Sequence, residues 1–107
     1  MLIKMYISKP NKFSLTQSMK QEIRSLEFTL ALEFGGYTQT RDTTGTWVNE
    51  DILYMNMTDV YELLISDYDH NHEAKIKEFI QNFGRIYEQK CLPFAVIGSH
   101  NHFVEIK

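Results

Sequence analysis

The sequence has few cysteines, prolines and glycines, the residues that are abundant in disulfide-rich secreted proteins and in fibrous proteins. Among its 107 residues there are 1 cysteine, 2 prolines and 5 glycines. Because an internal disulfide needs two cysteines, Cys91 cannot form one, and the fold has to be held by a packed core. The composition likewise contains no low-complexity segment and no linker. We therefore expect a protein of a reducing compartment, in which Cys91 is a small residue in or near the core.

Charge of one sign and long apolar runs are also missing. The 11 lysines and arginines are interspersed with 14 aspartates and glutamates, and the net charge is −3. A broad contact with nucleic acid or with a membrane surface would need a basic excess, so we expect neither partner. The apolar run in residues 1–4 is too short for a signal peptide or a membrane span, which favours a cytoplasmic location.

The sequence does contain enough apolar material for one core. Hydrophobic residues make up 43% and aromatic residues 13% of the chain. At this length such a composition is typical of one compact domain and leaves no room for a second. The sequence has no internal repeat. We expect residues 1–107 to form a single domain.

Two segments have helical periodicity. Over 14–34, apolar residues recur at steps of three and four, and Ser14 and Gln17 have the spacing of a capping box. A second helix is expected to start within 69–73, where an Asp or Asn can cap it, and Pro93 forbids its continuation. The apolar residues of each helix share one face. Each helix should therefore lay one stripe on a sheet.

Strands are predicted from runs of apolar, β-branched and aromatic residues. The pair Gly35-Gly36 ends the first helix, since glycine reaches the left-handed conformation without strain. A turn is expected at Asp42-Thr43-Thr44-Gly45, and another break at 98–101 forms a small hairpin. Residues 51–58 fit an extra strand or an inserted loop. The predicted strand segments are 2–7, the hairpin 37–48, 60–65 and 94–106.

The order of the predicted elements is strand, helix, strand, strand, helix, strand. This is the order of a ferredoxin-like α+β sandwich, in which two helices cover one face of an antiparallel sheet. The C-terminal hairpin is an addition to that plan. Because edge strands and one bare sheet face are common in this architecture, we expect an oligomer.

The four histidines lie in two identical tripeptides, His70-Asn71-His72 and His100-Asn101-His102. Two histidines one residue apart can share a face and chelate a metal such as zinc, with Asp67 or Asp69 as a further ligand. Both tripeptides fall at predicted turns or element ends, where polar residues are ordinary, and we interpret them as solvated histidines. The sequence has no phosphate loop or nucleophile elbow, and we expect neither a metal nor a cofactor.

Carboxylates and aromatic residues are better candidates for a site. Glu62 lies within an apolar strand, Asp59 precedes that strand, and Glu50 follows the predicted hairpin. An unpaired buried charge costs several kcal/mol, so Glu62 either faces solvent, which is the simpler interpretation, or sits in a pocket with a partner. Beside Tyr37 and Trp47, such a carboxylate could hold a cationic or purine-bearing small molecule.

Three stretches of the chain carry a resemblance to a known family. They are Gly36–Trp47, Asp59–Ile65 and Tyr87–Leu92, and they span about the C-terminal two-thirds of the chain. Together they resemble the small bacteriophage S-adenosylmethionine lyases. The resemblance implies a homotrimer with ligand sites between subunits, and cleavage of S-adenosylmethionine to methylthioadenosine and homoserine lactone. Such an activity would deprive host methylation or restriction systems of S-adenosylmethionine in the host cytoplasm.

The reaction of these lyases makes few demands on a protein. The substrate's own carboxylate attacks the carbon that bears the sulfonium, so the site mainly holds the substrate in attack geometry and excludes water. The resemblance implies a carboxylate that binds the substrate's ammonium group, a tyrosine that orients it and an aromatic ring that stacks on the adenine. The candidate catalytic residues are Asp59, Glu62, Glu50 and Tyr37, and the candidate substrate-binding residues are Trp47, Tyr61 and Thr38.

The chain departs from the lyase pattern at one position. The lyases carry a Glu just ahead of the strand that matches Val60–Ile65, whereas this chain has Thr58-Asp59, one methylene shorter. Two other functions therefore stay open. One is a non-catalytic oligomeric module that binds a nucleotide-like ligand between subunits, as PII-like proteins do. The other is a phage-encoded inhibitor or adaptor that acts through an acidic surface and an exposed strand.

Overall fold

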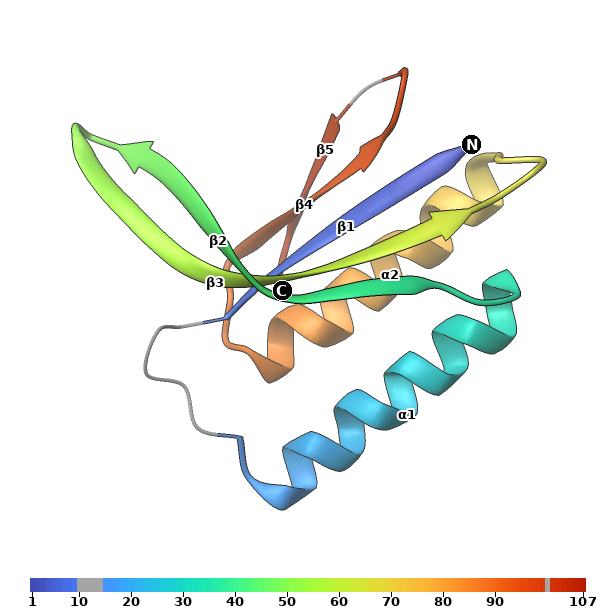
Figure 1. Cartoon of the computed structure of the whole chain (residues 1–107), viewed down its shortest axis with the longest axis horizontal. Helices are drawn as coiled ribbons and strands as arrows, with labels where there is room; N and C mark the ends of the chain where they lie inside the picture. The colour runs from blue at the N-terminus through green and yellow to red at the C-terminus, as the bar shows by residue number, and fades with distance from the viewer. Residues whose placement is uncertain (10–14, 100) are drawn as a thin grey trace.

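The chain folds into one antiparallel sheet with two helices on the same side (Figure 1). This computed structural model describes residues 1–9, 15–99 and 101–107, without the side chains of Trp47, Asn49 and Tyr54. The described strands pair in the order β2-β3-β1-β4-β5. This arrangement confirms the predicted ferredoxin-like α+β fold, with β5 as the added strand of the C-terminal hairpin. The elements are β1 (Leu2–Lys9), α1 (Gln17–Phe34), β2 (Thr38–Asn49), β3 (Ile52–Leu64), α2 (His70–Ile86), β4 (Cys91–Val96) and β5 (Asn101–Glu105).

The core lies between the sheet and the helices. On β1, alternate residues face the helices and are completely buried, while the residues between them are partly exposed. The second helix buries one stripe of residues three and four apart, as its periodicity predicts. The buried residues that show these two periods are Ile3, Met5 and Ile7 on β1, and Ile76, Phe79, Ile80 and Phe83 on α2.

The helix ends follow the local sequence closely. Gly35 closes α1 with φ +79°, as predicted. The N-cap of α1 is Thr16, whose hydroxyl accepts a hydrogen bond from the Met19 N–H at 3.2 Å. The predicted cap Ser14 lies outside the described residues. Asp69 caps α2 at the predicted place, and its carboxylate accepts two backbone N–H groups of the first turn at 3.0 Å.

The turn predicted at 42–45 is wrong. β2 runs through this segment, and the chain reverses at Glu50 and Asp51 instead. These two residues have φ of +51° and +63°, and a two-residue type I′ hairpin turn requires positive φ at both positions. The segment 51–58 is therefore extra strand, because β3 begins at Ile52 and pairs with β2.

The residues that suggested the wrong turn belong to a β-bulge. The register of β2 against β3 shifts between Thr40 and Thr43, and Asp42 in this interval has φ +57°. Gly45 is needed for space, because a Cβ there would lie 2.7 Å from the Thr58 hydroxyl oxygen. Asp42 thus forms part of a bulge, and Gly45 allows β2 and β3 to approach each other closely.

An Asn-Gly pair at 50–51 is expected to stabilise the protein by about 1 kcal/mol. Asn and Gly tolerate positive φ, which costs Glu and Asp more. The double variant Glu50→Asn, Asp51→Gly should shift the midpoint of urea unfolding upward. The same pair placed at Thr43 and Thr44 should lower it, since that segment is strand. If the pair at 43–44 raised the midpoint and the pair at 50–51 lowered it, the turn would lie at 42–45.

The outer half of the hairpin β2–β3 extends past the helices (Figure 1). It carries several exposed apolar side chains, and the sheet face away from the helices carries others, including Leu64 and Phe103. Neither helix in the described part of the chain has the length and hydropathy needed to cross a membrane. The exposed apolar residues of the outer hairpin are Val48, Ile52, Leu53, Met55 and Met57.

Candidate functional site

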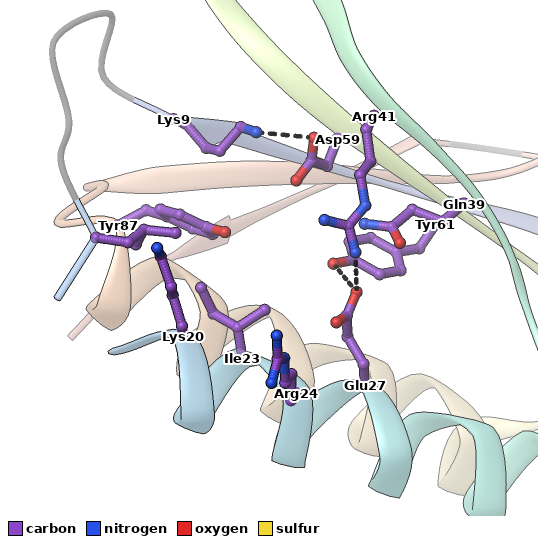
Figure 2. Close-up of a pocket in the computed structure, with 11 residues that line it drawn as sticks. Lys9, Lys20, Ile23, Arg24, Glu27, Gln39, Arg41, Asp59, Tyr61 and Tyr87 are labelled. Atoms are coloured by element: carbon purple, nitrogen blue, oxygen red, sulfur yellow. Dashed lines mark hydrogen bonds and ion pairs between the residues drawn. The ribbon is translucent and has the colours of Figure 1, made fainter. Parts of the chain in front are cut away.

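A pocket of about 310 Å³ opens between α1 and the sheet (Figure 2). Its volume is at the lower end of the roughly 300–1,000 Å³ typical of small-molecule sites. Two buried carboxylates, Glu27 of α1 and Asp59 of β3, lie in its wall together with the aromatic rings of Tyr61 and Tyr87. Four cationic side chains also line it. They are Lys9, Lys20, Arg24 and Arg41.

Glu27 is the site residue that the sequence analysis missed. It lies on the buried side of α1 and is only 8% exposed. Its Oε2 accepts a hydrogen bond from the Tyr61 hydroxyl at 2.9 Å and lies 3.7 Å from Nη2 of Arg41 (Figure 2). Its spacing with Ile23 and Leu30 puts a charge on the apolar stripe of the helix, and that pattern was the available signal.

Tyr61 connects this carboxylate to the core. It is 1% exposed, and its ring packs against Tyr37 and Phe83 with centroids 5.4 and 5.2 Å away. Burial, followed by the nearby charge of Glu27, raises the pKa of Tyr61 far above its ordinary value. The phenol therefore stays protonated and keeps its hydroxyl available as the donor to Glu27.

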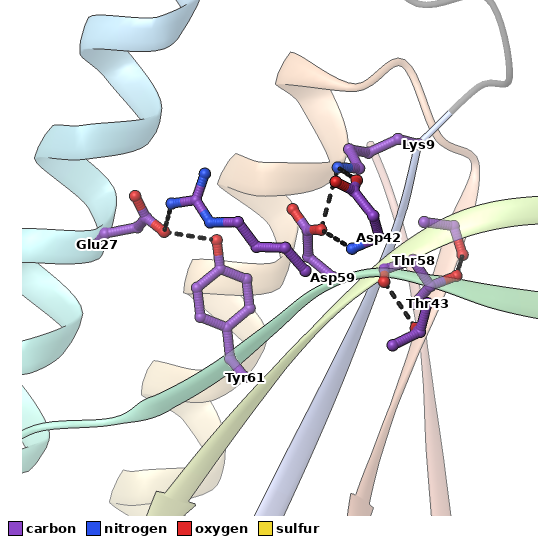
Figure 3. A network of polar contacts seen from close by, with 9 residues as sticks. Lys9, Glu27, Asp42, Thr43, Thr58, Asp59 and Tyr61 are labelled. Carbon is purple, nitrogen blue, oxygen red and sulfur yellow. Dashed lines mark hydrogen bonds and ion pairs between the residues drawn. The ribbon is translucent and has the colours of Figure 1, made fainter.

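Asp59 ties three strands together at the bulge (Figure 3). Its Oδ1 accepts the backbone N–H of Asp42 at 3.0 Å and lies 3.0 Å from Nζ of Lys9. Lys9 also donates to the Asp42 carboxylate at 2.7 Å. Burial alone would lower the pKa of Lys9, but its hydrogen bonds to Asp42 and Asp59 outweigh burial and the pKa is raised. The two carboxylates thus share the single ammonium of Lys9.

The structure gathers three of the seven predicted site residues. Asp59 and Tyr61 line the pocket, and Tyr37 packs on Tyr61. Glu62 and Thr38 are paired across β3 and β2. Because alternate strand residues face opposite sides, these two lie on the sheet face away from the helices. They are therefore separated from the pocket by the sheet.

The other predicted residues lie elsewhere in the fold. Glu50 is exposed at the turn of the β2–β3 hairpin, at the end of its outer half. The backbone of Trp47 pairs with that of Tyr54 in the outer half of the hairpin, but the Trp47 side chain lies outside the part of the chain that the structure describes. Glu62 has Lys4 as a neighbour, with 3.6 Å between its Oε1 and the lysine Nζ. The charge of Glu62 is thus paired with that of Lys4 on the partly exposed, helix-free face of the sheet.

The prediction of solvated histidines holds for His70, whose side chain is fully exposed, but not for His102. The His102 ring stacks on Phe94 with centroids 4.5 Å apart, and its Nε2 lies 3.3 Å from Oε1 of Glu73. Nδ1 of His70 lies 3.8 Å from the same carboxylate. His102 is therefore packed between β4 and α2 rather than solvated. Over residues 1–9, 15–99 and 101–107, no group of three or more His, Cys, Asp or Glu side chains is arranged to hold a metal, and His100 lies outside them.

The expectation that Cys91 belongs in or near the core is wrong. Cys91 is exposed at the start of β4. The next residue, Leu92, and Phe94 are buried against the helices. The alternation of the strand therefore turns the thiol to the other face of the sheet.

The comparisons with known proteins point to a fold rather than to a sequence family. No protein-family model and no curated protein sequence matches the chain. Among solved structures, the chain is similar to a phage SAM lyase in its apo state, with a TM-score of 0.68 and 6% sequence identity. The match covers 99% of this chain and 89% of that chain. This protein therefore shares the fold of that lyase along nearly its whole length.

Proposed function

We propose that this protein is a phage-type S-adenosylmethionine lyase, which cleaves S-adenosylmethionine to methylthioadenosine and homoserine lactone. The observation that carries the proposal is the shared fold with a phage SAM lyase over 99% of the chain. The pocket between α1 and the sheet supports it further, since a buried carboxylate and aromatic rings face one small space. These are the groups that suit a cationic, purine-bearing molecule.

The reaction balances without a protein nucleophile. An oxygen of the substrate carboxylate forms a bond to the carbon next to the sulfonium, and the carbon–sulfur bond breaks. The bonding electron pair leaves with sulfur, which becomes the neutral thioether of methylthioadenosine. The protein has to fold the substrate so that these atoms meet, and to keep water away from the reacting carbon.

Glu27 is suited to anchor the substrate's ammonium group. The ammonium keeps its charge throughout the reaction, whereas the sulfonium loses its own. A carboxylate at the ammonium therefore holds reactant and transition state alike, while one at the sulfonium would favour the reactant. Within the described residues, the contacts of Glu27 with Tyr61 and Arg41 both use Oε2. Its Oε1 is the atom that we assign to the ammonium.

We assign Tyr37 and Tyr61 to the aromatic wall of the site and Asp59 to its framework. Tyr61 lines the pocket beside Glu27, and the Tyr37 ring packs on Tyr61 and supports this wall. Asp59 is already occupied by Lys9 and by the Asp42 backbone. In this assignment Asp59 shapes the pocket wall and does not touch the substrate.

We propose further that the protein is a homotrimer with its sites at subunit interfaces. The supporting observation is the set of large apolar side chains exposed on the outer hairpin and on the helix-free sheet face. A neighbouring subunit would cover such surfaces and narrow the mouth of the pocket. Acting in the host cytoplasm, the enzyme would remove the S-adenosylmethionine that methylation and restriction systems need.

The decisive experiment is to incubate the purified protein with S-adenosylmethionine and to follow methylthioadenosine by chromatography. The expected result is product in proportion to protein, from a sample whose mass by light scattering is that of a trimer. Stabilisation by S-adenosylmethionine without product would overturn the lyase and leave the non-catalytic binding module. That second function is favoured by one feature: Asp59 and Glu27 already have protein cations as neighbours, Lys9 and Arg41.

A further inference from the structure

Two cations of the pocket, Lys20 and Arg24, take no part in the ion pairs of the described residues. Lys20 and Arg24 both line the cavity, and the Lys20 side chain extends from α1 toward the sheet (Figure 2). Neither forms an ion pair within residues 1–9, 15–99 and 101–107. The two carboxylates of the cavity contact its other two cations, Glu27 with Arg41 and Asp59 with Lys9. The cavity therefore has a local positive excess in a protein whose net charge is −3.

The positions of Lys20 and Arg24 are unfavourable for the helix itself. Lys20 lies just beyond the first turn of α1, near the end at which the helix dipole disfavours cations, and that turn has no acidic residue to compensate. Arg24 lies one turn after Lys20, beyond the range of this effect. They are also four residues apart, a spacing at which like charges repel. The other helix follows the usual rule, with Glu73 in its first turn and Arg85 in its last. Charges placed against local stability are expected where a ligand uses them.

Arg41 adds a third cation from the opposite wall. It comes from β2, next to the bulge, and extends into the same space as Lys20 and Arg24 (Figure 2). Its contact with Glu27 is a single 3.7 Å approach through Nη2, and its side chain is 66% exposed. A guanidinium has five N–H donors in a planar fork, so the contact with Glu27 leaves most of these donors available.

We propose that Lys20, Arg24 and Arg41 form a binding site for a small multivalent anion, a molecule that carries phosphate or several carboxylates. One such anion would offset the repulsion between Lys20 and Arg24. This site goes beyond the proposed lyase activity. S-adenosylmethionine has one carboxylate and two cationic groups, so it does not account for three converging cations.

The test is a calorimetric titration of the full chain with inorganic pyrophosphate, repeated with citrate, at low and at high salt. Wild-type protein should bind at least one of the two, more weakly at high salt because screening acts on exposed charges. The variant Lys20→Gln, Arg24→Gln should bind at least about 10-fold more weakly, as expected for the loss of two charge-assisted contacts. Pyrophosphate alone binding indicates a phosphate ligand, whereas equal binding of citrate indicates any multivalent anion.

A matched control removes the same charge from the other helix. In Lys75→Gln, Lys77→Gln the exposed cations of α2 are lost, and anion binding should be unchanged. No binding of either anion to folded wild-type protein would overturn the proposal, and so would an equal loss in both double variants. Methylthioadenosine formation is scored separately on the same samples. A failed lyase assay therefore leaves the result on the anion site intact.

Discussion

Replacing Glu27 by Gln is expected to lower kcat/KM for methylthioadenosine formation by roughly 10- to 100-fold, through a higher KM and with kcat little changed. Gln keeps the size of the side chain and an oxygen that can accept the Tyr61 hydroxyl. It lacks the negative charge that anchors the ammonium of S-adenosylmethionine, and a hydrogen bond to a charged group is worth about 1.5–3 kcal/mol. Initial rates over a range of substrate concentrations measure the effect.

The matched control for this variant is Glu62→Gln. Glu62 is also a carboxylate that the sequence predicts for the site, and it follows Tyr61 directly in β3. It faces the other side of the sheet, however, beside Lys4. Its neutralisation should leave the rate within about 2-fold of wild type, as expected for a partly exposed ion pair remote from the pocket. If Glu62→Gln abolishes turnover and Glu27→Gln does not, the substrate binds on the helix-free face.

Replacing Asp59 by Ala is expected to lower the free energy of unfolding by about 3 kcal/mol. The change leaves the Lys9 ammonium without its buried partner and the Asp42 N–H without an acceptor. Removing one member of a buried pair costs on the order of 3–5 kcal/mol, and here the partly exposed Lys9 places the loss at the lower end. Urea unfolding followed by circular dichroism measures it.

Asp42→Asn is the control for the same cluster. This variant also removes a carboxylate from Lys9, but the Asp42 side chain is largely exposed. Asn tolerates the positive φ of this position, so the bulge is preserved. The midpoint of unfolding should therefore move much less than in Asp59→Ala. Equal losses in the two variants would show that the exposed ion pair, and not the buried one, holds the bulge.

The local signals in the sequence predicted the elements of the fold well. Gly35 and Asp69 end and begin helices where expected, because a cap depends only on the few residues around it. The order of helices and strands followed from periodicity, since burial on one face imposes a period of two or of three and four. Element order then restricts the topology to few possibilities, of which the ferredoxin-like arrangement is the simplest.

The same local signals failed at the hairpin. Asp42 and Gly45 are turn-forming residues, yet one serves a bulge and the other a close approach to Thr58. Glu50 and Asp51 form the turn although neither favours positive φ. The register of a strand pair depends on contacts along its whole length, and these outweigh the preference of two turn residues.

The sequence by itself determined which segments are helix or strand and which face of each is apolar, because those properties follow from neighbouring residues. Only the tertiary structure decided the site. It placed Glu27 of α1 against Tyr61 of β3, 34 residues later, and separated Tyr61 from Glu62 by the thickness of the sheet. A pocket depends on which faces of distant elements meet, and no local pattern carries that information.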